Sequence, residues 1–149
     1  MPLADRFWSG KTYAVIGVHA PGRTLIPQFV KALEAAGKSV WLVDANGSPM
    51  GQRPVRPSLD GAPPLDGALI VAAPQEALAA VEACLAAGVP QLWLDTRGDS
   101  RAAADRARAG GVPCVVEACP LATMPGVGWG HHLHGRVARW LGRIREVEA

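Results

Sequence analysis

The sequence has few cysteines and no long apolar run, and these absences exclude several classes of protein. Only three cysteines occur, Cys84, Cys114 and Cys119, and none belongs to a Cys-x-x-Cys pair. No stretch of about 18 consecutive apolar residues is present, so we expect no membrane span. The first residues include Asp5 and Arg6 and lack the apolar core of a signal peptide. Together these features predict a protein of the reducing cytoplasm.

An excess of charge of one sign is also missing. The chain has 15 basic and 13 acidic residues, a net charge of +2, and the basic residues are spread along its length. This distribution gives no indication of nucleic-acid binding. Hydrophobic residues make up 49% and charged residues 19% of the 149 residues, as in an ordinary globular protein. The length is sufficient for a real core, so we expect one domain over residues 1–149.

What the chain does contain is a regular alternation of apolar segments and segments with helical spacing. Each of the three helices is followed by a glycine, as a helix C-terminus often is. Residues 45–66 interrupt the pattern with a Pro- and Gly-rich stretch that has no sustained period. The predicted strands are Thr12–Val18, Val40–Asp44, Gly67–Ala72, Gln91–Asp95 and Pro113–Glu117, and the predicted helices are Thr24–Ala36, Gln75–Ala87 and Asp99–Ala109.

This alternation predicts an α/β fold, a Rossmann-like three-layer sandwich with a mostly parallel five-stranded sheet. The expected strand order, numbered along the chain, is 3-2-1-4-5. In such sheets ligands bind beyond the carboxyl ends of the strands, near the point where the strand order reverses. That rule selects five loops as candidate ligand contacts, namely Gly17–Arg23, Asp44–Gly47, Ala72–Gln75, Asp95–Gly98 and Ala118–Thr123.

The C-terminal segment predicts a separate element. Residues 130–146 place Val137, Trp140, Leu141 and Ile144 at positions i, i+3, i+4 and i+7, with arginines on the other side. This spacing is typical of an amphipathic helix. We expect that helix to pack on its own sheet or on a second subunit, which leaves a homodimer open.

The loop after the first strand is the best candidate for an anion site. Gly17 and Gly22 occupy the first and third positions of a G-x-G-x-x-G pattern, but His19 occupies the middle one. The middle glycine normally lets the backbone approach a dinucleotide pyrophosphate, so the NAD pattern is broken. Arg23 adds a positive charge where a helix is predicted to begin, which favours a phosphate. The alternative is a simple tight turn.

Asp44, at the end of the second predicted strand, is compatible with NAD as an alternative ligand. An acidic residue at this position of NAD-binding units accepts a hydrogen bond from a ribose hydroxyl. The alternative is a carboxylate that caps the turn formed by Ala45–Gly47.

The ordered set of these segments carries a family resemblance. The segments are YAVIGVHAPGR, SVWLVDANG followed by MGQRPV, ALIVAAPQEAL, LWLDTRG and GVPCVVEACP. The set resembles the small stand-alone CoA-binding proteins, which are similar to the N-terminal domain of the succinyl-CoA synthetase α subunit. The likeness covers about residues 8–125, and residues 130–146 lie beyond it.

The resemblance implies a CoA site residue by residue. The first loop would receive the CoA phosphates, the turn after the second strand would lie against the adenosine part, and a segment after the third strand would lie beside adenine. A cysteine after the last strand is also common in the family. The implied residues are Gly17, Val18, His19, Gly22 and Arg23 for the first loop, Asp44, Ala45 and Asn46 for the turn, Val71, Ala72, Ala73 and Pro74 beside adenine, and Cys119.

No catalytic or metal site is predicted. His131, His132 and His134 have no carboxylate or cysteine within a helical turn, so we interpret them as a polar helix start or a subunit contact. Cys119 could act as a nucleophile with a histidine from the tail, but nothing nearby indicates an activated thiol. The RGD within residues 95–100 is interpreted as a turn and helix cap.

Three functions follow from these patterns. The first is non-catalytic binding of CoA or an acyl-CoA by a small-molecule site. The second is binding of NAD or another adenine nucleotide, favoured by Asp44 and opposed by His19. The third is an interaction module that has kept the fold and lost the ligand.

Overall fold

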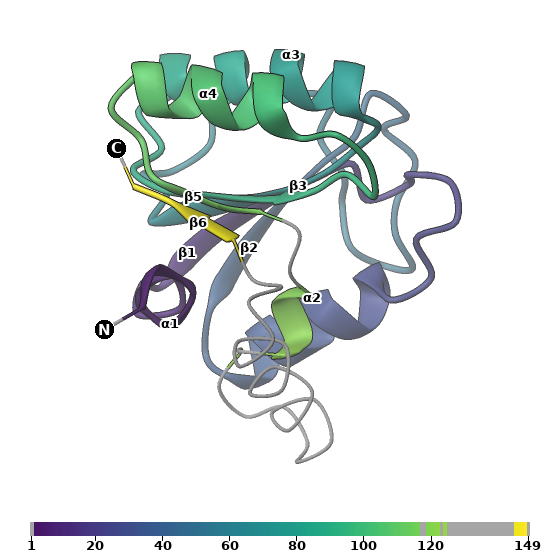
Figure 1. Ribbon diagram of the computed structural model, residues 1–149. Coiled ribbons are helices and arrows are strands. Elements are labelled where there is room, and N and C mark those ends of the chain that lie inside the picture. The colour runs from purple at the N-terminus through teal and green to yellow at the C-terminus, as the bar shows by residue number, and fades with distance from the viewer. Residues whose placement is uncertain (1, 117–118, 123, 125–144, 149) are drawn as a thin grey trace.

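The computed structural model describes residues 2–116, 119–122, 124 and 145–148 (Figure 1). None of the described helices is both long and apolar enough to cross a membrane. The elements follow one another in the alternation that the sequence predicts, with two additions at the ends of the chain. The helices are α1 (Leu3–Phe7), α2 (Ile26–Ala35), α3 (Pro74–Ala86), α4 (Arg101–Ala109) and the short 3-10 helix η1 (Pro120–Ala122). The strands are β1 (Thr12–Ile16), β2 (Ser39–Val43), β3 (Gly67–Val71), β4 (Leu92–Asp95), β5 (Cys114–Val116) and β6 (Arg145–Val147).

The described strands form a six-stranded sheet in the order β2-β1-β3-β4-β5-β6. Strands β1 to β5 are mutually parallel, which confirms the mostly parallel Rossmann-like sheet, and β6 joins the edge antiparallel to β5. The predicted order 3-2-1-4-5 is wrong, because β3 pairs with β1 rather than with β2. Both orders require the same succession of strands and helices along the chain, so the periodicity does not distinguish them.

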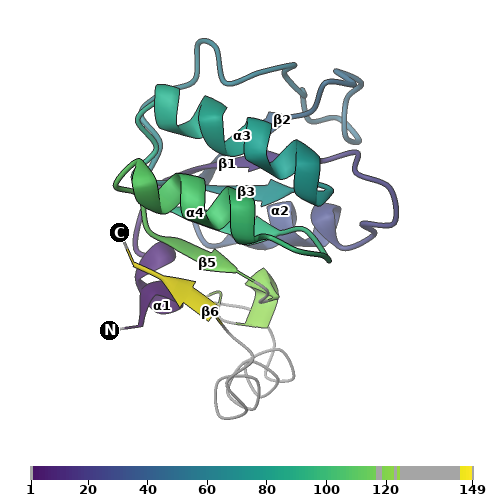
Figure 2. The same ribbon diagram turned by 45° about the horizontal axis from the view of Figure 1, so that its top comes forward.

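Alternate residues of the central strands supply two separate cores, as expected for a sheet covered on both faces. Leu69 and Val71 pack with α1 and α2 on one face. Ala68 and Ile70 pack with α3 and α4 on the other face. Figures 1 and 2 show the resulting three layers, with α3 and α4 on one side of the sheet and α1 and α2 on the opposite side. This arrangement confirms the predicted three-layer sandwich.

Helix α1 was not predicted, and it joins an aromatic cluster on the α2 side of the sheet. The ring of Phe7 lies 4.6 Å from that of Trp8 and 5.4 Å from that of Trp93, centroid to centroid. Tyr13 also contacts this cluster and donates a hydrogen bond of 2.6 Å from its hydroxyl to the Phe7 carbonyl. Burial raises the pKa of Tyr13 to about 12. The five-residue helix was missed because it is too short to show a helical period.

Strand β6 corrects the prediction for the end of the C-terminal helix. Arg145 and Glu146, which were predicted to be helical, belong to a strand that pairs with β5. The carboxylate of Glu146 accepts hydrogen bonds of 3.0 Å each from the backbone N–H groups of Leu3 and Ala4, at the start of α1. The rest of the predicted helix lies outside the described residues, including Val137, Trp140, Leu141 and Ile144.

The Pro- and Gly-rich stretch between β2 and β3 contains no helix, and no strand beyond single bridging pairs. It is held by a parallel bridge of Arg56 to Val43 and by a hydrogen bond of 3.3 Å from the Trp41 indole N–H to the Ser58 carbonyl. The guanidinium of Arg56 lies 5.5 Å from the centroid of the Trp41 ring. The prediction of an irregular excursion over residues 45–66 is therefore confirmed.

Candidate functional site

The strand order places the topological switch point of the sheet between β1 and β3. The chain leaves β1 for α2 on one face of the sheet and leaves β3 for α3 on the other face (Figure 1). Such a divergence is the point where ligands bind in open α/β sheets. Gly17, directly after β1, has φ +91°, and a Cβ atom there would overlap the carbonyl oxygen of Val71. Only glycine permits this close approach of the two strand ends.

A cavity of about 600 Å³ lies at this edge of the sheet, on the side of α2. Its volume is within the range of small-molecule sites, about 300–1,000 Å³. Three of the predicted site residues line it, namely Arg23, Val71 and Cys119. Its other lining residues come from α2, β3, the loop after β4 and η1, and they are Leu25, Ile26, Phe29, Leu69, Asp95, Thr96, Arg97, Gly98, Pro120 and Leu121.

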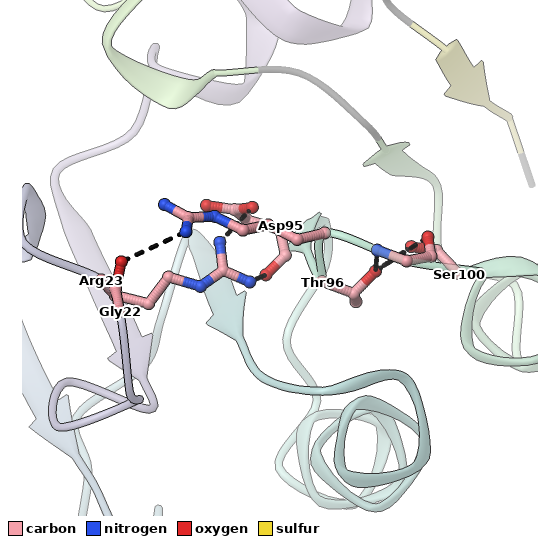
Figure 3. A network of polar contacts seen from close by, with 7 residues as sticks. Gly22, Arg23, Asp95, Thr96 and Ser100 are labelled. Atoms are coloured by element: carbon pink, nitrogen blue, oxygen red, sulfur yellow. Dashed lines mark hydrogen bonds and ion pairs between the residues drawn. The ribbon is translucent and has the colours of Figure 1, made fainter.

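Arg23 and Asp95 form an ion pair within the cavity lining (Figure 3). The Arg23 Nη1 lies 2.7 Å from Asp95 Oδ1, and Nη2 donates a 3.1 Å hydrogen bond to the Asp95 carbonyl. The Arg23 side chain is only 8% exposed. The charge predicted to favour a phosphate is therefore balanced by a carboxylate from the end of β4.

Arg97 lies in the same loop and was not among the predicted residues. Its φ of +54° is the only positive value for a non-glycine residue in the described part of the chain. The buried Thr96 stabilises the loop, because its hydroxyl contacts Ser100 Oγ at 2.6 Å (Figure 3). The exposed Arg97 donates a 3.2 Å hydrogen bond from Nη1 to the Gly22 carbonyl, and it forms no ion pair with a described carboxylate. Backbone strain of this kind is concentrated at functional sites.

The start of α2 belongs to the same lining and has no side-chain cap. Leu25 is the N-cap residue and gives no side-chain hydrogen bond, and the first turn contains no acidic residue. Leu25 and Ile26 both line the cavity. A helix N-terminus without a side-chain cap presents a positive dipole end to an anion, while Pro27 in this first turn has no N–H to donate.

Asp44 lies in a separate cluster that closes the turn after β2. Its Oδ1 accepts a 2.8 Å hydrogen bond from the backbone N–H of Asn46, and its Oδ2 accepts one of 2.9 Å from the backbone N–H of His19. The His19 ring nitrogen Nε2 lies 2.6 Å from the Ser48 carbonyl. This geometry agrees with the predicted alternative of a turn-capping carboxylate. The His19 N–H, a candidate phosphate donor, is already satisfied by Asp44.

The remaining predicted residues divide by exposure. Val18 and Ala72 are buried, and neither lines the cavity. Ala45 and Ala73 are exposed, and Pro74 is half-buried at the first turn of α3. The described structure thus brings Arg23, Val71 and Cys119 together, leaves the Asp44 turn in its own cluster, and adds Arg97, which the sequence patterns did not single out.

The other motifs of the sequence are the cysteines, the RGD segment and the histidines near the C-terminus. Cys84 and Cys114 are buried, and burial raises the pKa of the Cys84 thiol to about 12. Cys119 is half-buried in the cavity lining. Within the described residues no group of three His, Cys, Asp or Glu side chains could hold a metal ion. Ser100 is the N-cap residue of α4 and makes no side-chain cap hydrogen bond, while the carboxylate of the preceding Asp99 accepts a 3.0 Å hydrogen bond from the backbone N–H of Arg101. His131, His132 and His134 lie outside the described residues.

The fold is that of a Rossmann-like domain, with a cavity at the carboxyl edge of its sheet. Residues 11–125 match the model of the CoA binding domain family, and the chain therefore belongs to that family. No curated protein matches the chain.

Solved structures of low sequence identity share the fold. A hypothetical protein from Pyrococcus horikoshii OT3 is 20% identical with a TM-score of 0.70, over 90% of this chain and 95% of that one. A protein from Thermus thermophilus is 20% identical with a TM-score of 0.66, over 87% of this chain and 93% of that one. The dinucleotide-forming acetyl-coenzyme A synthetase 1 of Ca. Korarchaeum cryptofilum is 20% identical with a TM-score of 0.60. That match covers 74% of this chain but only 26% of the synthetase.

Proposed function

We propose that this protein is a non-catalytic, cytoplasmic CoA-binding protein that holds the ligand at the crevice between β1 and β3. The observation that carries the proposal is the convergence of Arg23, Arg97 and the uncapped start of α2 on one cavity. Membership of the CoA binding domain family supports CoA as the ligand. The three cysteines form no disulfide with one another, which is in accord with a reducing compartment.

The phosphates are assigned to Arg23 and Arg97 in the cavity lining. Arg97 has no described carboxylate partner, so its charge is free to pair with a phosphate oxygen. Arg23 is held by Asp95, and it contributes when a phosphate competes with that carboxylate. Guanidinium groups bind phosphate oxygens in a bidentate geometry, which suits this role.

The adenosine part is assigned to the neighbouring exposed surface. Ala45 and Asn46 after β2, and Ala73 and Pro74 after β3, lie beyond the carboxyl ends of the two parallel strands that flank β1. Each Asp44 oxygen accepts one described N–H, and a carboxylate has about four acceptor positions, so Asp44 retains the capacity to accept from a ribose hydroxyl.

Calorimetry with CoA, dephospho-CoA, NAD and ATP tests the proposal. We expect CoA to bind more tightly than NAD or ATP, and Arg97→Ala to weaken CoA binding several-fold because a charge-assisted contact is lost. Arg108→Ala is the matched control, since Arg108 is an exposed arginine of α4 that does not line the cavity. Binding of NAD in preference to CoA would assign the crevice to a dinucleotide. Absence of binding by all four compounds would favour the interaction module.

A further inference from the structure

The interior of the cavity has apolar walls, which neither the phosphates nor the adenine of CoA require. Its walls include Phe29 and Ile26 from α2, Leu69 and Val71 from β3, and Leu121 from η1. All five side chains are aliphatic or aromatic, and all are buried in the sheet core on that side. Apolar walls gain free energy from apolar ligand groups in proportion to the area that both remove from water.

One large apolar side chain of the lining, that of Leu25, is exposed to solvent. Leu25 is 48% exposed, and within the described residues only Leu78 is a second exposed large hydrophobic residue, at 37%. Leu25 precedes α2 and lines the cavity, whereas Leu78 belongs to α3 on the opposite face of the sheet (Figure 2). The two leucines therefore form a natural test pair, one inside and one outside the candidate site.

The charged residues of the lining and its buried apolar walls come from different parts of the fold. Arg23 and Arg97 come from the loops after β1 and β4 and Asp95 from the end of β4, while the five buried apolar side chains come from α2, β3 and η1. A ligand that matches this arrangement has an anionic part joined to an apolar part. Free CoA supplies the anionic part but ends in a polar pantetheine arm with a small thiol.

From this arrangement we infer that the cavity receives the apolar acyl chain of an acyl-CoA. The inference rests on the proposed CoA-binding function and adds the class of acyl group, an unbranched or branched hydrocarbon rather than a polar or dicarboxylic one. The protein thereby distinguishes acyl-CoA thioesters from free CoA. A fatty acid shares the chemistry of an apolar chain with an anionic end, so the experiment must separate the two sources.

The first experiment is calorimetry with free CoA, acetyl-CoA, butanoyl-CoA, hexanoyl-CoA and octanoyl-CoA, and with octanoate alone. Each buried methylene is worth about 0.8 kcal/mol, so affinity should rise about fourfold per methylene until the cavity is filled. Equal affinities across the CoA series would overturn the inference and leave the CoA proposal intact. Octanoate binding as tightly as octanoyl-CoA would overturn the CoA proposal and assign the cavity to fatty acids. Failure of every compound to bind overturns both.

The second experiment compares Leu25→Gln with Leu78→Gln. Leu25→Gln should lower the affinity for octanoyl-CoA about tenfold more than the affinity for free CoA, because it removes apolar surface from the lining. Leu78→Gln should leave both affinities unchanged, since Leu78 does not line the cavity. Both leucines are exposed, so neither change removes a core side chain. Equal losses for octanoyl-CoA and free CoA in Leu25→Gln would contradict the acyl assignment.

Cys119 gives an independent readout without substitution in the cavity. It is the only one of the three cysteines that is not buried, and it lines the cavity. At matched saturation, octanoyl-CoA should slow alkylation of Cys119 by iodoacetamide more than free CoA does, because the chain fills the space beside the thiol. Equal protection by the two ligands would place the acyl chain elsewhere and overturn the inference.

Discussion

The guanidinium of Arg23 is held by the carboxylate of Asp95, with 2.7 Å between Nη1 and Oδ1, inside the lining of the candidate ligand cavity. The arginine comes from the loop after β1 and the aspartate from the end of β4, so the pair joins two of the loops that the strand order brings to the crevice. An anionic ligand must compete with Asp95 for Arg23.

The first prediction follows from this competition. Asp95→Asn should raise the affinity for CoA several-fold, because it removes a negative charge that both pairs with Arg23 and repels phosphate. Arg23→Ala should lower the affinity. Asp99→Asn removes the same charge from a nearby exposed position outside the cavity lining, and it should have a much smaller effect. Calorimetry at two salt concentrations measures both changes, and equal effects of Asp95→Asn and Asp99→Asn would contradict the competition.

The second prediction concerns the close approach of β1 and β3. Gly17→Ala should lower the free energy of unfolding by more than about 2 kcal/mol, because it adds a steric overlap with the Val71 carbonyl to the cost of a positive φ. Gly37 has φ +77°, and a Cβ atom at that position would meet no heavy atom within 4 Å. Gly37→Ala should therefore carry only the backbone cost, about 1–2 kcal/mol. Urea unfolding of the two variants provides the comparison. Equal losses would show that the strand ends separate readily.

The third prediction concerns the cap of α1. Glu146→Ala should lower the free energy of unfolding by about 0.5–2 kcal/mol, since it removes the acceptor of the Leu3 and Ala4 N–H groups. Glu148→Ala breaks only an exposed ion pair with Arg6, worth about 0–1 kcal/mol. Thermal unfolding of both variants measures the difference. A loss in Glu148→Ala as large as that in Glu146→Ala would contradict the capping role.

The fourth prediction is a pH dependence due to Asp66. Its Oδ2 accepts hydrogen bonds of 2.6 Å and 2.9 Å from the backbone N–H groups of Lys11 and Thr12, and these lower the pKa of the carboxyl in the folded protein. Because the folded pKa lies below the unfolded value, about 3.9, the stabilisation is complete above that value. It is lost as the pH falls through the folded pKa.

Asp66→Asn should therefore be less stable than the wild type at neutral pH, and the difference should shrink below about pH 4. Asp60→Asn makes the same change at an exposed position in the preceding loop and provides the control for the substitution itself. Urea unfolding between about pH 2 and pH 7 measures the effect. A difference that stays constant over this range would show that the charged form of Asp66 carries no stabilisation.

The elements with a full period were predictable from the sequence, and their spatial order was not. Apolar segments and C-terminal glycines indicated β1 to β5 and α2 to α4 because burial on two faces requires continuous apolar strands. The neighbour of β1 depends on how the irregular residues 45–66 cross the sheet, and no periodicity encodes that path. Strand β6 has three residues, too few to interrupt the helical spacing that precedes it.

The sequence predicted the loops that form the candidate site better than it predicted the side chains within them. Arg23 was found because it follows a Gly-rich loop, and the loop containing Arg97 was selected by the rule for strand ends. Arg97 itself was missed, although a basic residue in a selected loop was the available signal. The role of Asp44 could not be predicted from the sequence, because its hydrogen-bond donor, the N–H of His19, lies 25 positions away along the chain.

The hydrogen bonds between Glu146 and the first turn of α1 join two parts of the chain that are synthesised at different times. The N–H groups of Leu3 and Ala4 leave the ribosome more than a hundred residues before their acceptor does, with separations of 143 and 142 positions. Translation adds about 5–20 residues per second, so Glu146 is made several seconds after Leu3 and Ala4. Helix α1 gains the acceptor of its first N–H groups only once β6 has been synthesised. The first helix of the chain is among the last parts of the fold to be secured.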